Sequence, residues 1–383
     1  MSTTTPQGFR AAGVAAGLKS SGAADVALVV NDGPDDAAAA VFTTNRFPAA
    51  PVTWSRQVLS TGRLRAVVLN SGGANACTGA DGFADTHATA EHAAAQLGLG
   101  AIDVAVASTG LIGVRLPMDR LLPGVTGAAQ ALSADGGPAA ARAIMTTDSV
   151  PKTTAVEGAG WTVGGMAKGA GMLAPSLATM LVVLTTDAVV PAELLQPALA
   201  RATAVSFERV DSDGCLSTND TVIVMANGAS GVTPTAEEFT AALTAACTDL
   251  AMQLLADAEG STKDIAITVR NAATVQDALT AGRACARNNL LKTALFGNDP
   301  NWGRVLAAIG TTDAAFEPDR VDVIINGVPV CRGGAIGDPR EGVDLTGRTI
   351  TIDVDLRAGA EQATIWTNDL SIAYVHENSA YST

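Results

Sequence analysis

The sequence predicts a mixed α/β protein in which helices cover sheets with antiparallel as well as parallel strand pairs. Short runs rich in β-branched residues recur along the chain, as is typical of strands. Helical patterns lie between these runs, but the two alternate irregularly. Because a doubly wound parallel sheet is built from regular β-α-β units, we expect a layered α/β sandwich instead.

Strands are expected where short apolar runs rich in β-branched residues are bounded by Gly, Asn, Asp or Pro. In the first part of the chain these runs are Ala24–Val30, Arg65–Asn70, Ile102–Ser108, Thr179–Asp187 and Thr221–Gly228. After Asp264 the clearest runs are Thr349–Leu356 and the alternating run Ala363–Val375.

Three helices have recognisable signals. The clearest begins at Thr235, which forms a capping box with Glu238, and its apolar face continues until Gly260 can end it. A long helical run covers Ala273–Leu295. A third helix is expected to begin at Asp299, followed by proline at the first helical position, and to reach Ile309.

Composition excludes several classes of protein. The chain has 383 residues, of which 48% are hydrophobic and 16% charged, so it can bury a large core and is not disordered. Its length fits two domains or one large one. Twenty-four basic and 38 acidic residues leave a net charge of −14, which argues against nucleic-acid binding.

The cysteines and the chain ends point to a cytoplasmic protein. Five scattered cysteines include no C-x-x-C pair, so we expect buried free thiols rather than disulfides or a zinc site. No segment has the features of a signal peptide or of a membrane span, which needs roughly 20 apolar residues. The stretches expected to be least ordered are the N-terminal tail through Pro6 and the loop Ser133–Pro138.

Short matches to catalytic motifs lack the context that their chemistry needs. Gly169–Ala174 fits a loose dinucleotide fingerprint, but proline and a strand follow it instead of a helix. Ser149–Lys152 fits S-x-x-K without its companion motifs. His87 and His92 are five residues apart on an expected helix, which places them on different sides. Asp211–Gly214 resembles a calcium loop without the distal glutamate. We therefore expect no metal site.

The stretch from Met166 to Asp187 carries the strongest chemical signal. Lys168 and a Gly-rich loop lead to Ala178 and Thr179 at the start of an apolar strand. One interpretation is an ordinary turn before a strand. The other is that cleavage after Ala178 makes Thr179 a terminal nucleophile, whose α-amino group, with a pKa of about 7.7 to 8.0, replaces histidine as the base. Lys168 would lower that pKa by like-charge repulsion.

The run KGAGMLAPSLATML resembles the signature of the ornithine acetyltransferase family, also called the bifunctional glutamate N-acetyltransferase or arginine biosynthesis J family. Further motifs match it in order along nearly the whole chain: AVFTTNRFPAAPV, LNSGGANACTG, ASTGLIG, AIMTTDSVPK, DSDGCLSTNDT, AEGSTK, DPNWGR and ENSAYST. The resemblance favours the nucleophile interpretation of Thr179. Leu177 stands where many relatives have methionine, which is a conservative exchange.

The resemblance implies a fold, a processing event and an assembly. The fold is a mixed α-β-β-α sandwich, similar to the N-terminal-nucleophile-like fold of the DmpA aminopeptidases. Autoproteolysis between Ala178 and Thr179 gives an α chain of residues 1–178 and a β chain of residues 179–383, which has 383 − 178 = 205 residues. The two chains stay together, as α2β2 or a larger assembly.

The resemblance also implies a ping-pong reaction without a cofactor. Thr179 takes the acetyl group from N2-acetyl-L-ornithine, and the amine of L-glutamate then removes it. Thr109 and Gly110 match the oxyanion hole. Residues that match substrate contacts are Thr146, Lys168, Thr179, Glu259, Asn378 and Thr383, and the choice between Thr146 and Thr147 is open. Use of acetyl-CoA as a second donor is also open.

Ordinary explanations exist for the same residues. Thr109 and Gly110 could form a turn that ends a strand, Glu259 could be a solvated residue at a helix end, and Asn378 and Thr383 could belong to a frayed tail. Two rival functions follow from the residue chemistry. One is an aminopeptidase or amidohydrolase of the same self-cleaving architecture, and the other is a metabolite-binding protein without catalysis.

Overall fold

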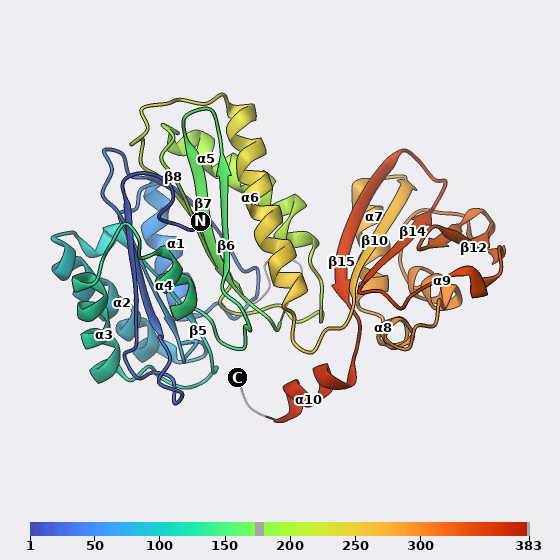
Figure 1. The fold of residues 1–383 in the computed structure, drawn as a ribbon, viewed down its shortest axis with the longest axis horizontal. Coiled ribbons are helices and arrows are strands. Elements are labelled where there is room, and N and C mark those ends of the chain that lie inside the picture. The colour runs from blue at the N-terminus through green and yellow to red at the C-terminus, as the bar shows by residue number, and fades with distance from the viewer. Residues whose placement is uncertain (173–179, 381–383) are drawn as a thin grey trace.

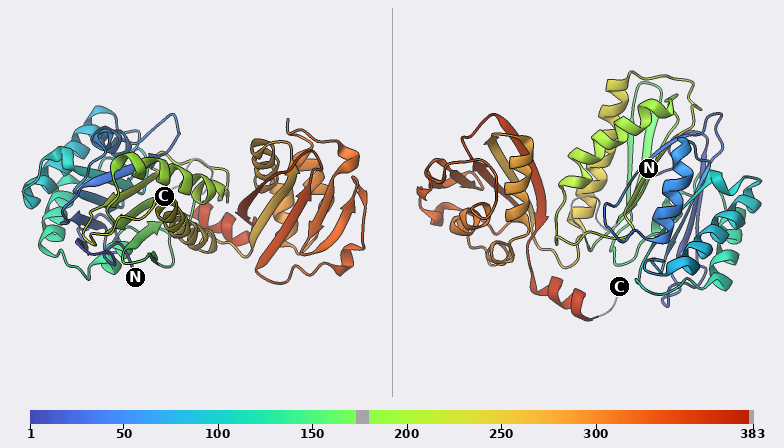
Figure 2. Two further views of the ribbon diagram at one scale, coloured as in Figure 1. Left: turned by 90° about the horizontal axis from the view of Figure 1, so that it is seen from above. Right: turned by 180° about the vertical axis from the view of Figure 1, so that it is seen from behind.

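The computed structural model describes residues 1–172 and 180–380. The chain forms an N-terminal body, which holds elements β1 to α6, and a C-terminal body, which holds β10 to β15 (Figure 1). The two bodies lie side by side along the longest axis, and the view from above separates them clearly (Figure 2). The last helix, α10 (Ile372–Ala380), leaves the C-terminal body and extends beneath the N-terminal one (Figure 1).

Two mixed sheets form the centre of the N-terminal body. Sheet A has the order β1-β2-β4-β5, and only its β4–β5 pair is parallel: β1 (Phe9–Val14), β2 (Val26–Asn31), β4 (Ala66–Ser71) and β5 (Val104–Thr109). Sheet B has the order β3-β9-β8-β7-β6, and only its β8–β9 pair is parallel: β3 (Ala37–Phe42), β9 (Thr221–Ala226), β8 (Leu181–Thr186), β7 (Thr162–Lys168) and β6 (Lys152–Glu157).

The side chains of β8 show how the two sheets are layered. Leu181 and Val183 belong to a core that also contains the strands of sheet A. Val182 and Leu184 alternate with them and belong to a second core with helices α5 and α6. Helices α2 and α3 cover the other face of sheet A. These layers confirm the predicted α-β-β-α sandwich.

Among the described residues, six α-helices accompany these sheets: α1 (Ala50–Val58), α2 (Gly79–Leu97), α3 (Met118–Gln130), α4 (Gly137–Ala143), α5 (Ala192–Val205) and α6 (Ala236–Ala256). The capping box predicted for α6 is confirmed, because Glu238 N donates to Thr235 Oγ1 at 3.2 Å and Thr235 N donates to the Glu238 carboxylate at 2.9 Å. By length and hydropathy alone, α6 could span a membrane. It packs as a core helix instead, with Phe239, Leu243 and Leu250 fully buried.

The C-terminal body is a third sheet with helices packed on it. Its strand order is β13-β12-β11-β14-β10-β15: β13 (Ala335–Ile336), β12 (Val328–Arg332), β11 (Asp322–Ile325), β14 (Thr349–Asp355), β10 (Asp264–Ala272) and β15 (Glu361–Asn368). Helices α7 (Val275–Ala286), α8 (Asn289–Phe296) and α9 (Trp302–Ile309) complete its core.

Three boundaries predicted in this body are wrong. The helix expected over Ala273–Leu295 is two helices, because Asn288 accepts a hydrogen bond from Leu291 N at 2.9 Å and caps a new one. Helix α9 is capped by Asn301, whose side chain accepts from Arg304 N, and not by Asp299. The last strand ends at Asn368 instead of Val375.

The stretches expected to be least ordered are built into the fold. Thr3 is fully buried, and its carbonyl accepts from Thr185 Oγ1 at 2.7 Å. Ser133 and Ala11 exchange backbone hydrogen bonds of 3.0 Å. The cysteine prediction holds only in part, because Cys77 and Cys215 are exposed whereas the other three are buried.

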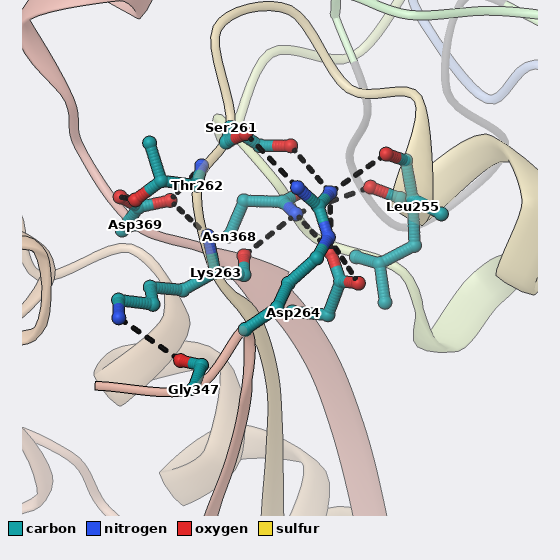
Figure 3. Close-up of polar contacts among 10 residues, drawn as sticks. Leu255, Ser261, Thr262, Lys263, Asp264, Gly347, Asn368 and Asp369 are labelled. Atoms are coloured by element: carbon teal, nitrogen blue, oxygen red, sulfur yellow. Dashed lines mark hydrogen bonds and ion pairs between the residues drawn. The ribbon is translucent and has the colours of Figure 1, made fainter. Parts of the chain in front are cut away.

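Polar contacts join the end of α6 to the C-terminal body (Figure 3). Asp369 accepts from the backbone N–H groups of Thr262 and Lys263 at 2.8 and 2.9 Å. Asn368 Nδ2 donates to the carbonyls of Leu255 and Lys263 at 3.1 and 3.0 Å. These polar side chains bind backbone groups of the connection. Strand β15 ends at Asn368 because its partner β10 begins opposite it, at Asp264.

Candidate active site

A small cavity of about 70 Å³ collects most of the residues predicted from the sequence. Its walls come from the end of β5, the loop after α4, the end of β7, the loop after α6, and α10. It is lined by Thr109, Gly110, Ile112, Thr146, Thr147, Lys168, Gly171, Met172, Glu259 and Asn378. Five segments that are far apart in sequence therefore meet at one site.

The corner after β5 holds Thr109 and Gly110 in one geometry. The carbonyl of Thr109 accepts from the N–H groups of Gly72 and Gly73, both at 3.0 Å. Gly110 has a φ of +129°, and a Cβ there would lie 2.5 Å from the nitrogen of Gly73. A side chain at residue 110 would thus collide with backbone, so the corner needs glycine.

Lys168 lies at the end of β7 and is almost completely buried. Its Nζ donates to Thr109 Oγ1 at 3.2 Å. Burial lowers the pKa of Lys168, while the nearby carboxylates, above all Asp148, act to raise it. A buried ammonium thus faces the same cavity as the predicted oxyanion hole.

Thr146 and Thr147 both line the cavity, so the structure does not choose between them. The backbone of Thr146 is fixed by Asp148, whose Oδ2 accepts from Thr146 N at 2.9 Å. Burial acts to raise the pKa of Asp148, but Lys168, Lys152 and the N–H of Gly169 outweigh it and lower the pKa to about 2.

Glu259 reaches the cavity from the loop after α6. Its N–H donates to the carbonyl of Ala170 at 2.9 Å, which joins this loop to the Gly-rich stretch. A Cβ on Gly171 would lie 2.7 Å from Glu259 Oε2, so the carboxylate rests against bare backbone. Within the described part of the chain this carboxylate has no hydrogen bond or ion pair, and it can therefore accept a cationic ligand group.

The remaining predicted residues are Asn378, Ala178, Thr179 and Thr383. Asn378 lines the cavity from α10, where its Nδ2 also donates to the carbonyl of Tyr374 at 3.0 Å. Ala178, Thr179 and Thr383 lie outside the described residues. The roles assigned to all these residues remain predictions.

Two buried acids of the site were missed by sequence reasoning. The first is Asp148, described above. The second is Asp220, which is fully buried and whose Oδ1 accepts a hydrogen bond from Met180 N at 3.0 Å. Met180 directly follows Thr179 in the sequence. Asp220 Oδ2 has no hydrogen-bond partner among the described residues, and burial raises its pKa well above the usual range. Both acids lie in matched motifs, TTDSVPK and STNDT, which could have drawn attention to them.

The side chains of the weak motif matches make structural contacts within the fold. Ser149 and Lys152 of the S-x-x-K match both bind Asp257. His87 packs against the ring of Trp54 at 4.9 Å, and His92 Nε2 lies 2.7 Å from a threonine hydroxyl. Over residues 1–172 and 180–380, no three or more His, Cys, Asp or Glu side chains gather in a way that could hold a metal ion.

Comparison with known proteins places the chain among relatives of similar length. It is 64% identical over 382 residues to the arginine biosynthesis bifunctional protein ArgJ of Streptomyces coelicolor. It is 63% identical over 383 residues to the protein of the same name from Thermobifida fusca. Both comparisons cover 100% of this chain and 100% of the relative. A crystal structure of ornithine acetyltransferase complexed with ornithine from Mycobacterium tuberculosis is 63% identical, with 47% of this chain and 96% of that chain covered and a TM-score of 0.45. The ArgJ family model matches residues 10–383, so the chain belongs to the ArgJ family.

Proposed function

We propose that this chain is an acetyltransferase of arginine biosynthesis, which moves the acetyl group of N2-acetyl-L-ornithine to L-glutamate through an acetyl-Thr179 intermediate. The observation that carries this proposal is the single cavity that joins Thr109, Gly110, Lys168 and Glu259. Relatives at 64% identity over the whole chain bear the name arginine biosynthesis bifunctional protein, which supports the same pathway.

The donor half-reaction assigns one task to each group. The α-amino group of Thr179 takes the hydroxyl proton, and the oxygen attacks the acetyl carbonyl. The hydroxyl of Thr109 and the N–H of Gly110 stabilise the oxyanion. The proton then passes to the leaving amine of ornithine. Glu259 binds the cationic end of the substrate, and Lys168 binds its carboxylate. Thr146, Asn378 and Thr383 complete the substrate contacts.

The acceptor half-reaction returns the enzyme to its starting state. The amine of L-glutamate attacks the acetyl ester, and Thr179 is released while N-acetylglutamate forms. No metal or organic cofactor takes part in either half. The word bifunctional in the names of the relatives supports a second activity, in which acetyl-CoA donates the acetyl group to glutamate.

Self-cleavage between Ala178 and Thr179 creates the nucleophile. Strands β7 and β8 lie on the two sides of this bond and pair with each other, from Val163 opposite Thr186 to Lys168 opposite Leu181. Chains 1–178 and 179–383 would therefore share sheet B and both cores of the N-terminal body. They stay associated after cleavage and assemble as α2β2 or larger, in the cytoplasm.

Intact mass and a coupled assay test the proposal. Wild-type protein should give two chains in place of one of 38.4 kDa, whereas Thr179→Ala should remain one inactive chain. Thr179→Ser is the matched control, because it keeps a hydroxyl nucleophile. With acetylornithine, added glutamate should speed ornithine release and yield N-acetylglutamate. Free acetate at a rate independent of glutamate would instead identify an amidohydrolase, and acetyl-CoA as sole donor tests the second activity.

A further inference from the structure

We propose that Asp148 is a positioning residue of the acetyl-transfer site, which holds Thr146 and Gly169 at the cavity and keeps an anion beside Lys168. This inference rests on the proposed function.

The carboxylate of Asp148 ties two walls of the cavity together. Its Oδ2 accepts from Thr146 N at 2.9 Å, and its Oδ1 accepts from Gly169 N at 2.7 Å. Thr146 lines the cavity itself, and Gly169 follows Lys168 directly. One buried side chain thereby sets the distance between the loop after α4 and the end of β7. Hydrogen bonds to a buried carboxylate are among the stronger ones, so this spacing is well defined.

Lys152 lies between Asp148 and a second acid, Asp257, which is only partly buried. Its Nζ donates to Asp148 Oδ1 at 2.6 Å and to Asp257 Oδ2 at 2.5 Å, and the lysine is fully buried. If Asp148 loses its charge, Lys152 still has the carboxylate of Asp257 as a partner. Asp257 itself contacts Ser149 and Lys152 and lines no wall of the cavity. Asp257 is therefore a control for the loss of one carboxylate that binds Lys152.

Asp148 is also the main anion acting on Lys168. Glu259 and Asp220 attract the same ammonium less strongly, while Lys152 on β6 and Lys19 on the loop before β2 repel it. Burial already lowers the pKa of Lys168. Removal of the negative charge at residue 148 should lower that pKa further, so that Lys168 loses its proton, and its hold on a substrate carboxylate, at a lower pH.

The test compares pH profiles of kcat/KM for Asp148→Asn and Asp257→Asn. In Asp148→Asn, the alkaline limb of the kcat/KM profile should move to lower pH by about one unit or more. The reason is that removal of a buried charge partner shifts the pKa of Lys168 by that order. At a fixed alkaline pH the KM for acetylornithine should rise roughly tenfold, and it should recover at lower pH. Asp257→Asn should leave the limb in place.

A charge-retaining variant and the activity of the wild-type protein complete the test. Asp148→Glu retains the charge and should retain the wild-type alkaline limb, even if its longer side chain lowers kcat. An alkaline limb at the wild-type position in Asp148→Asn, or a shifted limb in Asp148→Glu, would overturn the proposal. If wild-type protein transfers no acetyl group, the proposed function fails; if it does and all the profiles coincide, only the role of Asp148 fails.

Discussion

The hydroxyl of Thr109 is oriented by its neighbour before any substrate arrives. The ammonium group of Lys168 can only donate, so Thr109 Oγ1 is the acceptor of their 3.2 Å hydrogen bond. The proton of Thr109 is then left for another acceptor, and the side chain lines the cavity. A hydroxyl arranged in this way can donate to an oxyanion without reorganising, which is the condition for effective catalysis by such a group.

Replacement of Thr109 by valine should therefore reduce turnover. Valine keeps the shape of threonine and its preference for a strand but removes the donor, so we expect kcat to fall about 10²- to 10³-fold, with KM changed much less. Thr109→Ser keeps a hydroxyl and should stay close to wild type. Steady-state kinetics measure both. A valine variant with nearly normal kcat would mean that Thr109 only ends a strand.

At the scale of elements, α10 carries a cavity residue although it buries no side chain of its own. Its start is anchored by Ser371, whose hydroxyl donates to the carbonyl of Gly260 at 2.5 Å and accepts from Tyr374 N at 2.9 Å. Gly260 has no room for a Cβ, which would lie 2.2 Å from Tyr374 N. Asn378 lies seven residues, or about two turns, beyond Ser371 and lines the cavity.

Truncation after Val375 should separate stability from function. The shortened chain keeps the anchor at Ser371 and loses Asn378. The free energy of unfolding should change by less than about 1 kcal/mol, because none of the described residues that are removed is buried. Acetyl transfer should nevertheless fall to near background. Urea unfolding and the transfer assay measure the two effects. Full activity in the truncated protein would show that the end of the chain is a frayed tail.

At the scale of the whole molecule, the two bodies meet through buried polar groups. Lys292 on α8 donates to the carbonyl of Ser212 in the N-terminal body and to Thr367 Oγ1 on β15. Burial lowers the pKa of Lys292 to about 8, although Asp213, Asp211 and Asp369 oppose this shift. The ionised form of Lys292 therefore carries a desolvation cost that its hydrogen-bond partners and the nearby carboxylates only partly offset.

This cost predicts how stability depends on pH. Between the folded pKa of about 8 and an unfolded value of about 10.4, the unfolded chain holds more protons, so the free energy of unfolding should rise with pH. The slope from this lysine is at most about 1.4 kcal/mol per pH unit. Urea unfolding from pH 7.5 to 10 should show this rise in wild-type protein and less of it in Lys292→Met. Identical slopes would place the pKa of Lys292 near its ordinary value.

The sequence by itself determined the local elements and the chemical inventory. Strand runs, the Thr235–Glu238 capping box and the ordered motifs lie within short windows, so propensity and spacing could predict them. It also indicated Thr109, Gly110, Lys168 and Glu259, which the fold brings to one cavity. It missed the break at Asn288, because a single capping side chain there outweighs a continuous helical pattern.

Tertiary structure alone decided the electrostatics of the site. The partners of Asp148 include Gly169, which is 21 residues away, and Asp257 binds Ser149 across 108 residues. No local pattern encodes such pairs, since they depend on which loops meet after the sheets have packed. The same packing removes water from Lys168, Asp148 and Asp220. Burial sets the direction of the pKa shift for Lys168 and Asp220, whereas the neighbouring lysines and the N–H of Gly169 lower the pKa of Asp148. The residue types came from the sequence, but their charge states and mutual orientation came from burial.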